Sequence, residues 1–503
     1  MPKIRKVLVA NRGEIAIRVM RTCKELGIAT AAVYSEADRA ALHVRTADQA
    51  FLVGPPPSRE SYLVQQRIID AAKQAGADAI HPGYGFLSEN ASFVRACEAA
   101  GLIFIGPPAS AMDAMGEKTR ARANMIKAGV PVVPGTTEPI ATLEEARDYA
   151  EKIGFPVMLK AAGGGGGKGM RKVERAADFD SSWRAAKSEA MNAFGNDAVY
   201  IEKYLEKPHH VEIQVFADQY GNTIHLNERE CSAQRRHQKV VEETPSPILT
   251  PEMRAKMGEV AVKAAKAVNY VGAGTVEFLV DVHRNFYFLE MNTRLQVEHP
   301  VTEWVTGLDL VAMQIKAAEG EKLPLTHAPE PRGHSIEVRV YAEDPARNFM
   351  PSPGKITYLR VPGGPNVRDD SGVFPGYTVP NFYDPMISKL SVWAPTRAEA
   401  IARAQRALSE YVVKGITTNI RYLKAILAHP EFVGGDYDTS FLTREHEVLL
   451  GTEDAKLSEM ALLASAVHAY QRDQKRAKTL PTASGQGGGN GGVSPWKLAL
   501  RRR

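Results

Sequence analysis

The sequence has 503 residues, of which 44% are hydrophobic and 24% are charged, and its formal net charge is +5. This composition is typical of a folded chain of roughly three domains, and the small net charge argues against a nucleic-acid-binding protein. Three cysteines without CxxC spacing indicate a reducing compartment. No run approaches the ~18 apolar residues of a membrane span. We therefore expect a cytoplasmic enzyme that binds neither nucleic acid nor membrane.

The first part of the chain alternates between strands and helices. The pattern predicts a strand over 6–10, a helix over 13–26 and a second strand over 28–34, which together form a βαβ unit. The turn at 11–14 lacks a GxGxxG motif, so a dinucleotide-dependent oxidoreductase is not favoured. Because the alternation continues beyond this unit, we expect a doubly wound domain over 1–115.

A glycine-rich segment separates two predicted strands, 156–160 and 170–173. It fails the Walker A pattern, because Ala162 replaces the first glycine and Gly169 replaces the Ser or Thr. No helix is predicted directly after this segment, unlike in a Walker A motif. We expect a flap whose backbone N–H groups close over phosphates, and the alternative is a disordered linker.

Residues 275–281 and 286–292 alternate as two half-buried strands joined by a polar loop. A four-residue loop predicts that Asp281 faces Phe286 and that Glu277 faces Glu290, with Asn292 on the same face as Glu290. Two carboxylates opposite each other repel unless a cation lies between them. Glu277, Glu290 and Asn292 therefore indicate a divalent-metal and nucleotide site, and the alternative is a solvated polar face.

A later strand, 334–341, is predicted to place Glu337, Arg339 and Tyr341 on one face and three aliphatic residues on the other. Helices are predicted over 397–411 and 455–478. The final residues combine a Gly/Ser-rich linker with a short basic end.

These motifs resemble those of biotin carboxylase, a family of ATP-grasp enzymes. The family motif EMNxRxQVEHxVTE stands at 290–303, and the loop 81–90, the glycine-rich lid and the run 227–239 also match. The resemblance covers about residues 3–445.

The resemblance implies a fold of mixed α/β and α+β class with three domains. We expect an N-terminal Rossmann-like domain (1–115), an ATP-grasp domain (116–330, lid about 131–203), a C-terminal biotin carboxylase domain (334–445), and a helix, linker and tail (446–503).

The resemblance also implies a role for each matched residue. Arg339 steadies biotin, and Glu298 is the base that deprotonates bicarbonate. Bicarbonate binds Lys239, Arg294, Gln296, the Val297 backbone and Glu298. Mg²⁺ or Mn²⁺ binds Glu277, Glu290 and Asn292. The nucleotide contacts are Lys118, Lys160, Gly165, Gly166, Gly167, Glu202, Lys203, Leu205, His210, Gln234, His237, Glu277, Leu279 and Glu290.

The implied reaction is ATP- and bicarbonate-dependent carboxylation of biotin, through carboxyphosphate, as the first half-reaction of an acyl-CoA carboxylase such as the acetyl-CoA carboxylase of fatty acid metabolism. The implied partners are a biotin carboxyl carrier protein, carboxyltransferase subunits and a second copy of the chain. The alternatives are a split pyruvate carboxylase, another ATP-grasp ligase and a non-catalytic nucleotide-binding subunit.

No Met-Lys-Met motif for biotin attachment occurs in the sequence, and fewer than sixty residues follow the matched region. We therefore predict that this chain is never biotinylated and that the carrier is a separate polypeptide. Trp496, Leu498 and Leu500 near the end are a candidate docking peptide for a partner subunit, with an unstructured end as the alternative.

Overall fold

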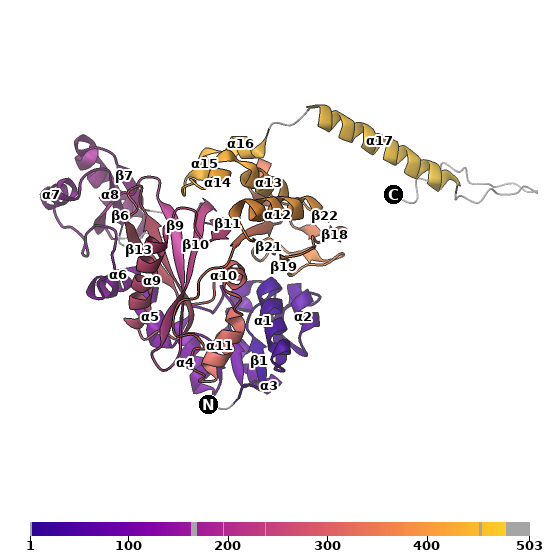
Figure 1. The fold of residues 1–503 in the computed structure, drawn as a ribbon, viewed down its shortest axis with the longest axis horizontal. Coiled ribbons are helices and arrows are strands. Elements are labelled where there is room, and N and C mark those ends of the chain that lie inside the picture. Colours follow the sequence, from indigo (N-terminus) through magenta and orange to yellow (C-terminus); the bar gives the residue numbers. More distant parts are fainter. Residues whose placement is uncertain (1–2, 162–168, 195, 237, 452–454, 479–503) are drawn as a thin grey trace, which may run out of the picture. The chain divides into compact units, whose positions relative to one another are not determined.

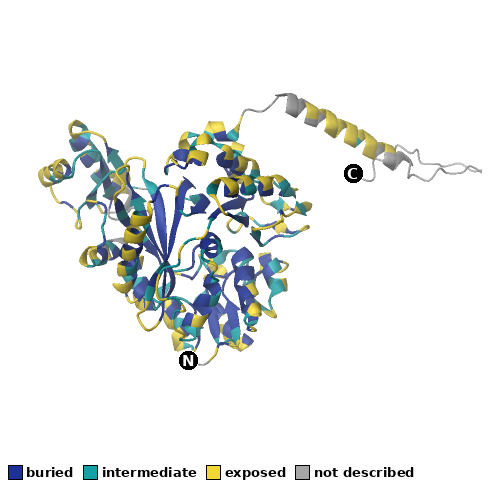
Figure 2. Ribbon diagram, in the orientation of Figure 1, coloured by how far each residue is buried: buried dark blue, intermediate teal, exposed yellow. Residues whose placement is uncertain are grey.

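The computed structural model of the chain describes residues 3–161, 169–194, 196–236, 238–451 and 455–478. The chain divides into two compact units, Met1–Leu450 and Gly451–Arg503. Figure 2 shows that the strands at the centre of the first unit are buried.

The N-terminal domain is a parallel sheet of strand order β3-β2-β1-β4-β5 (Figure 1). Val7 and Val9 enter a core that includes α1, whereas Leu8 enters a second core that includes α3 and α4. Helices therefore cover both faces, which confirms the doubly wound prediction. The elements are β1 (Lys6–Val9), α1 (Gly13–Glu25), β2 (Ala29–Ser35), α2 (Leu42–Thr46), β3 (Gln49–Gly54), α3 (Gln65–Ala75), β4 (Ala79–His81), α4 (Ala91–Ala99), β5 (Ile103–Phe104) and α5 (Ala109–Gly116).

An eight-stranded sheet forms the centre of the first unit, in the order β13-β12-β9-β10-β11-β14-β21-β19. It runs without interruption from the predicted ATP-grasp region into the predicted C-terminal domain, because β11 pairs with β14. The strands are β9 (His209–Ala217), β10 (Thr223–Arg235), β11 (Gln238–Thr244), β12 (Gly272–Val280), β13 (Phe286–Asn292), β14 (His334–Tyr341), β19 (Val367–Ser371) and β21 (Met386–Ala394).

Helices cover this sheet and bury its apolar residues. On β14, Ile336, Val338 and Val340 join the core that contains α12 and α13, which confirms the predicted apolar face. The helices are α9 (Pro251–Lys266), α10 (His299–Thr306), α11 (Leu310–Ala318), α12 (Arg397–Glu410), α13 (Ile420–Ala428), α14 (Pro430–Gly434), α15 (Phe441–Arg444) and α16 (His446–Leu450). Short strand pairs complete the region: β15 (Glu343–Asp344) with β16 (Met350–Pro351), β17 (Gly354–Lys355) with β20 (Thr378–Val379), and β18 (Tyr358–Arg360) with β22 (Val412–Lys414).

The lid is a small domain with its own core. Its sheet has the order β7-β6-β8, and two helices pack on it through Phe179, Trp183 and Ala146. The two predicted strands are confirmed, because β6 and β7 pair antiparallel, whereas most of the glycine segment between them, 162–168, lies outside the described residues. The elements are α7 (Leu143–Ile153), β6 (Val157–Ala161), β7 (Met170–Val173), α8 (Phe179–Phe194) and β8 (Val199–Lys203), and α6 (Lys118–Lys127) precedes them.

The second unit contains the predicted C-terminal helix, α17 (Ala455–Lys478). Its large apolar side chains at Met460, Leu463, Val467 and Tyr470 are exposed. The predicted docking peptide lies outside the described residues. None of the helices that the structure describes is long and apolar enough to cross a lipid bilayer.

Candidate active site

A cleft of about 1100 Å³ lies between the lid and the large sheet, and most of the predicted site residues line it. Side chains from β9, β10, β11, β12, β13 and β14 face it, together with the loop before α10. The predicted residues on its wall are Lys160, Glu202, His210, Gln234, Lys239, Glu277, Glu290, Asn292, Arg294, Gln296, Val297, Glu298 and Arg339.

The β12–β13 hairpin brings the predicted metal ligands together. Glu277 pairs with Glu290 across the strands, as predicted, and the Nδ2 of Asn292 donates to Glu277 at 2.8 Å. The predicted pairing of Asp281 with Phe286 is wrong, because Val280 faces Phe286.

The error has a physical reason. Asp281 leaves the strand, and its carboxylate accepts hydrogen bonds from the backbone N–H groups of His283 and Asn285 at 2.9 and 2.8 Å. The register then shifts between Glu277 and Phe278, which restores the predicted carboxylate pair. Such bulges are frequent beside active sites, where they redirect side chains.

Lys239 is the centre of the buried charge network at this end of the cleft. Its ammonium group donates to Glu212, to Glu277 at 3.0 Å and to Glu298 at 2.7 Å. Burial opposes the charge, but the three carboxylates raise the pKa of Lys239 well above its ordinary value. Lys239 is therefore a fixed positive charge on the cleft wall.

Glu298 is ionised although it is fully buried. Its second oxygen accepts a hydrogen bond from Arg339 at 3.0 Å. Burial raises the pKa of Glu298, but Lys239 and Arg339 outweigh it and hold this pKa well below the ordinary value. A carboxylate at the cleft wall that is charged at neutral pH has the protonation state that a general base requires.

Arg294 is held by three side chains from two segments of the chain. Its guanidinium donates to Glu89 at 3.0 Å, to Asn292 at 3.0 Å and to Gln296 at 2.7 Å. Glu89 belongs to the loop 81–90, so this loop does reach the site, and it also accepts from the Thr293 N–H at 3.0 Å. The arginine is consequently presented to the cleft in one orientation.

Behind the wall lie residues that the sequence did not single out. Arg229 is completely buried and donates to Glu212 at 2.5 Å, Gln214 at 2.7 Å and Thr302 at 2.9 Å. Lys389, also buried, donates to the Val297 carbonyl at 2.7 Å. The alternation of 209–217 was the available signal for Glu212, because it places that carboxylate on the same face as His210.

At the nucleotide end, Lys160 and Glu202 form an ion pair. The predicted contacts Lys203, Leu205 and Leu279 do not line the cleft. The ammonium of Lys203 instead donates to the carbonyls of Gly154 and Phe155 at 2.9 and 3.0 Å. Gly165, Gly166, Gly167 and His237 lie outside the described residues, as does the side chain of Lys118.

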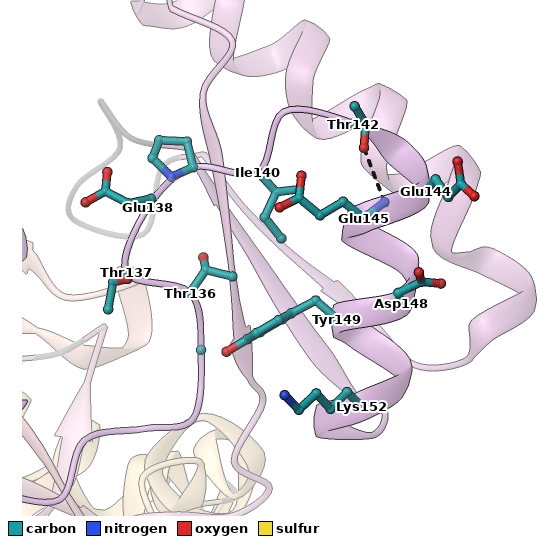
Figure 3. A pocket seen from close by; sticks show the side chains of 12 residues that line it. Thr136, Thr137, Glu138, Ile140, Thr142, Glu144, Glu145, Asp148, Tyr149 and Lys152 are labelled. Atoms are coloured by element: carbon teal, nitrogen blue, oxygen red, sulfur yellow. Dashed lines mark hydrogen bonds between the residues drawn. The ribbon is translucent and has the colours of Figure 1, made fainter.

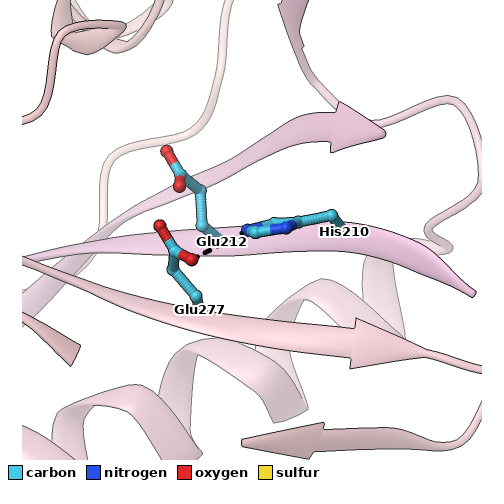
Figure 4. Close-up of side chains that lie close together, drawn as sticks. All are labelled: His210, Glu212 and Glu277. Carbon is cyan, nitrogen blue, oxygen red and sulfur yellow. Dashed lines mark ion pairs between the residues drawn. The ribbon is translucent and has the colours of Figure 1, made fainter. Parts of the chain in front are cut away.

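The ligand atoms on the wall of the cleft around Glu277 suit a hard cation. His210, Glu212 and Glu277 offer ligand atoms within 4.8 Å of one another (Figure 4), and His210 lies 3.0 Å from Glu277. Glu212 already compensates Arg229 and Lys239. Mg²⁺ prefers oxygen ligands, so Glu277, Glu290 and Asn292 on the cleft wall fit it better than a set that includes the histidine.

A second groove of about 720 Å³, which we call the outer groove, lies on the lid beside α7 (Figure 3). Thr136, Thr137 and Glu138 line both hollows. The outer groove contains none of the predicted site residues, and α7 forms much of its wall. Its carboxylates are Glu138, Glu144, Glu145 and Asp148.

Three family profiles match the chain. They are "Biotin carboxylase, N-terminal domain" over 3–112, "Carbamoyl-phosphate synthase L chain, ATP binding domain" over 117–326, and "Biotin carboxylase C-terminal domain" over 337–444.

Among curated relatives, Biotin carboxylase 1 of Bacillus subtilis is 55% identical, over 87% of this chain and 98% of that protein. A pyruvate carboxylase subunit of Methanothermobacter thermautotrophicus is 55% identical, over 87% and 89%. The alpha subunit of mitochondrial methylcrotonoyl-CoA carboxylase from Dictyostelium discoideum is 50% identical, over 95% of this chain but 69% of that protein.

Solved structures agree with these relatives. A Campylobacter jejuni biotin carboxylase structure is 50% identical, with a TM-score of 0.82 over 88% of this chain and 99% of that one. The biotin carboxylase domain of Hydrogenobacter thermophilus 2-oxoglutarate carboxylase is 47% identical, with a TM-score of 0.82 over 89% and 99%. The chain belongs to the biotin carboxylase family and is an ATP-dependent ligase.

Proposed function

We propose that this chain carboxylates biotin on a separate carrier protein, in the cytoplasm, as the first half-reaction of an acyl-CoA carboxylase. The observation that carries the proposal is the ionised Glu298, buried between Lys239 and Arg339 on the wall of the cleft. A base that is flanked by two fixed cations suits a small anionic substrate that must lose a proton.

Each residue then has a defined task. Lys239, Arg294, Gln296 and the Val297 N–H hold bicarbonate, and Glu298 takes its proton so that the γ-phosphate of ATP can be attacked. Lys160, Glu202 and His210 contact the nucleotide. Arg339 stabilises negative charge on the ureido oxygen of biotin. Most of the rate enhancement comes from positioning and charge neutralisation, as in other phosphoryl transfers.

Glu277, Glu290 and Asn292 are the proposed ligands of Mg²⁺ or Mn²⁺. A divalent ion held by these residues would supply positive charge that neutralises the transferred phosphate. The Hydrogenobacter thermophilus structure is described with MgADP, ADP, bicarbonate and a domain dimer, which supports a magnesium–nucleotide site and a homodimer here.

The acceptor of the carboxyl group is the second part of the proposal. The relatives include subunits of an acyl-CoA carboxylase and of a pyruvate carboxylase, so a split pyruvate carboxylase is the competing function. The test adds the purified chain, ATP and bicarbonate to a biotinylated carrier with either an acyl-CoA or a keto-acid carboxyltransferase.

We expect carboxylated product only with the acyl-CoA enzyme. Product with pyruvate alone would assign the chain to the competing function. Avidin blotting of the same mixture tests the separate carrier, because a covalent biotin signal on this chain would contradict it.

A further inference from the structure

Two glutamates lie side by side behind the cleft, where the mechanism above does not use them. Glu242 on β11 pairs directly with Glu337 on β14, and both are completely buried. Partners in an antiparallel register project to the same face of the sheet. Neither lines the cleft, so they form its second layer.

This pair is short of hydrogen-bond donors. Both oxygens of Glu337 and the Oε2 of Glu242 are buried without a partner among the described residues. Two adjacent buried carboxylates cannot both stay ionised, because each raises the cost of charging the other. A single proton between them removes the repulsion and supplies the missing donor.

Arg339 connects this pair to the cleft. Its Nε donates to Glu242 at 2.6 Å, while its Nη2 donates to Glu298 at 3.0 Å. The guanidinium is therefore held from behind by Glu242 and from the cleft side by Glu298. When Glu298 accepts a proton from substrate, only the rear contact retains its charge.

Burial and the neighbouring charges together set the pKa values of the two glutamates. Burial raises the pKa of Glu242 to about 7 and raises that of Glu337 well above its ordinary value. Four charged groups lie next to the pair: Lys239 and Arg339 on the same two strands, Lys389 on β21, and Glu298 before α10. Lys389 is itself paired with Glu14 on α1. Behind Lys239 lie Glu212 on β9 and Arg229 and Cys231 on β10.

We propose that Glu242 and Glu337 share one proton and act as positioning residues that keep Arg339 aimed at biotin throughout the reaction. The inference rests on the proposed function of the cleft. With one proton, the pair presents a single negative charge to the rear of Arg339. Loss of that proton adds a second charge, which draws the guanidinium away from the cleft and weakens biotin binding.

The test is the pH profile of biotin-dependent ATP cleavage with free biotin, between about pH 6 and about pH 9. In the wild type, KM for biotin should rise on the alkaline side as the pair loses its proton. Glu337→Gln cannot lose one, so this rise should disappear while kcat changes little. Glu242→Gln removes the rear charge, so KM for biotin should rise about tenfold at every pH.

Glu230→Gln is the matched control. Glu230 is also completely buried, and its pKa is raised by burial to about 7, but its oxygens accept from Ser232 and Ser246 rather than from Arg339. Its profile should follow that of the wild type. If Glu337→Gln fails to fold, as judged by circular dichroism, Glu242→Gln decides the test, since its KM for biotin must exceed that of the wild type at the acidic end of the profile, where the wild-type pair still holds its proton.

The two levels of the account fail differently. A wild type without biotin-dependent ATP cleavage would contradict the proposed function. A wild type that is active, but whose profile is shared by Glu337→Gln and Glu242→Gln, would overturn the proton-sharing pair alone.

Discussion

The large sheet and the lid both carry ion pairs, but they place them in opposite environments. On the large sheet, the side chains of Arg229 and Glu212 are both 0% exposed. On the lid, the side chains of Arg147 and Asp180 are 44% and 38% exposed. A buried charge must be paired or it destabilises the fold, whereas an exposed pair is screened by water. The large sheet therefore holds buried, fixed charges beside the cleft, whereas the Arg147–Asp180 pair lies on the solvent side of the lid and serves no proposed step.

Removing a buried cation should have the largest effect on stability. Arg229→Met removes the donor to Gln214 and Thr302 and leaves Glu212 with Lys239 as its remaining cation. We expect the free energy of unfolding to fall by about 3–5 kcal/mol, the usual result of breaking a buried pair. Denaturant unfolding followed by tryptophan fluorescence measures it, and a loss below about 1 kcal/mol would show that water reaches this network.

Lys239→Met tests whether the buried charges act on substrate as well as on the fold. Loss of the fixed cation should lower biotin-dependent turnover by about 10²–10³-fold, the size found for preorganised electrostatic groups. Lys152→Met, in the outer groove of Figure 3, is the matched control and should retain wild-type turnover. An equal loss of turnover in both variants would contradict the assignment of the cleft, and not the outer groove, as the active site.

A buried histidine extends the comparison to pH. Burial lowers the pKa of His81 to about 4, so between about pH 6.5 and about pH 4 the unfolded chain takes up a proton that the folded chain refuses. The contribution of the neutral His81 ring to the free energy of unfolding is complete above about pH 6.5, and about 3 kcal/mol of it is lost as the pH drops to about 4.

His81→Asn should remove that part of the pH dependence in equilibrium unfolding experiments. His283→Gln, at an exposed position, should keep the wild-type slope. An unchanged slope in His81→Asn would mean that the His81 ring is protonated in the fold.

The smallest effect is expected on the lid surface. Arg147→Met removes the ion pair with Asp180, and because both side chains are solvated, we expect no resolvable change in melting temperature or turnover. Calorimetry at low and high salt checks this. A large drop in melting temperature would show that the contrast between the two regions is wrong.

The sequence predicted local features well where one periodicity decides them. The apolar face of β14 followed from alternation alone. The opposition of Glu277 and Glu290 was predicted from the loop length, and it holds because a bulge offsets the shifted register near Asp281. The pairing of Asp281 was missed because a side chain that caps a turn competes with strand pairing. Alternation does not reveal this competition.

Contacts between segments that are distant in the chain could not be predicted from the sequence. Glu89 accepts a hydrogen bond from Arg294, which lies 205 residues further along the chain, and Lys389 donates one to the carbonyl of Val297, which lies 92 residues before it. No pattern in either segment marks its partner, because such contacts depend on how the domains pack. The resemblance supplied the substrate-facing residues, whereas the second layer that orients them, including Glu242 and Glu337, came from the structure.

The most direct test of the account follows label from radioactive bicarbonate into free biotin. With ATP and Mg²⁺, the wild-type chain should form labelled carboxybiotin, and omission of ATP should abolish it. Glu298→Gln should bind ATP as tightly as the wild type but transfer label about 10²–10⁴-fold more slowly, since it lacks the base. A wild type that transfers no label, or a Glu298→Gln variant that transfers it at the wild-type rate, would contradict the account.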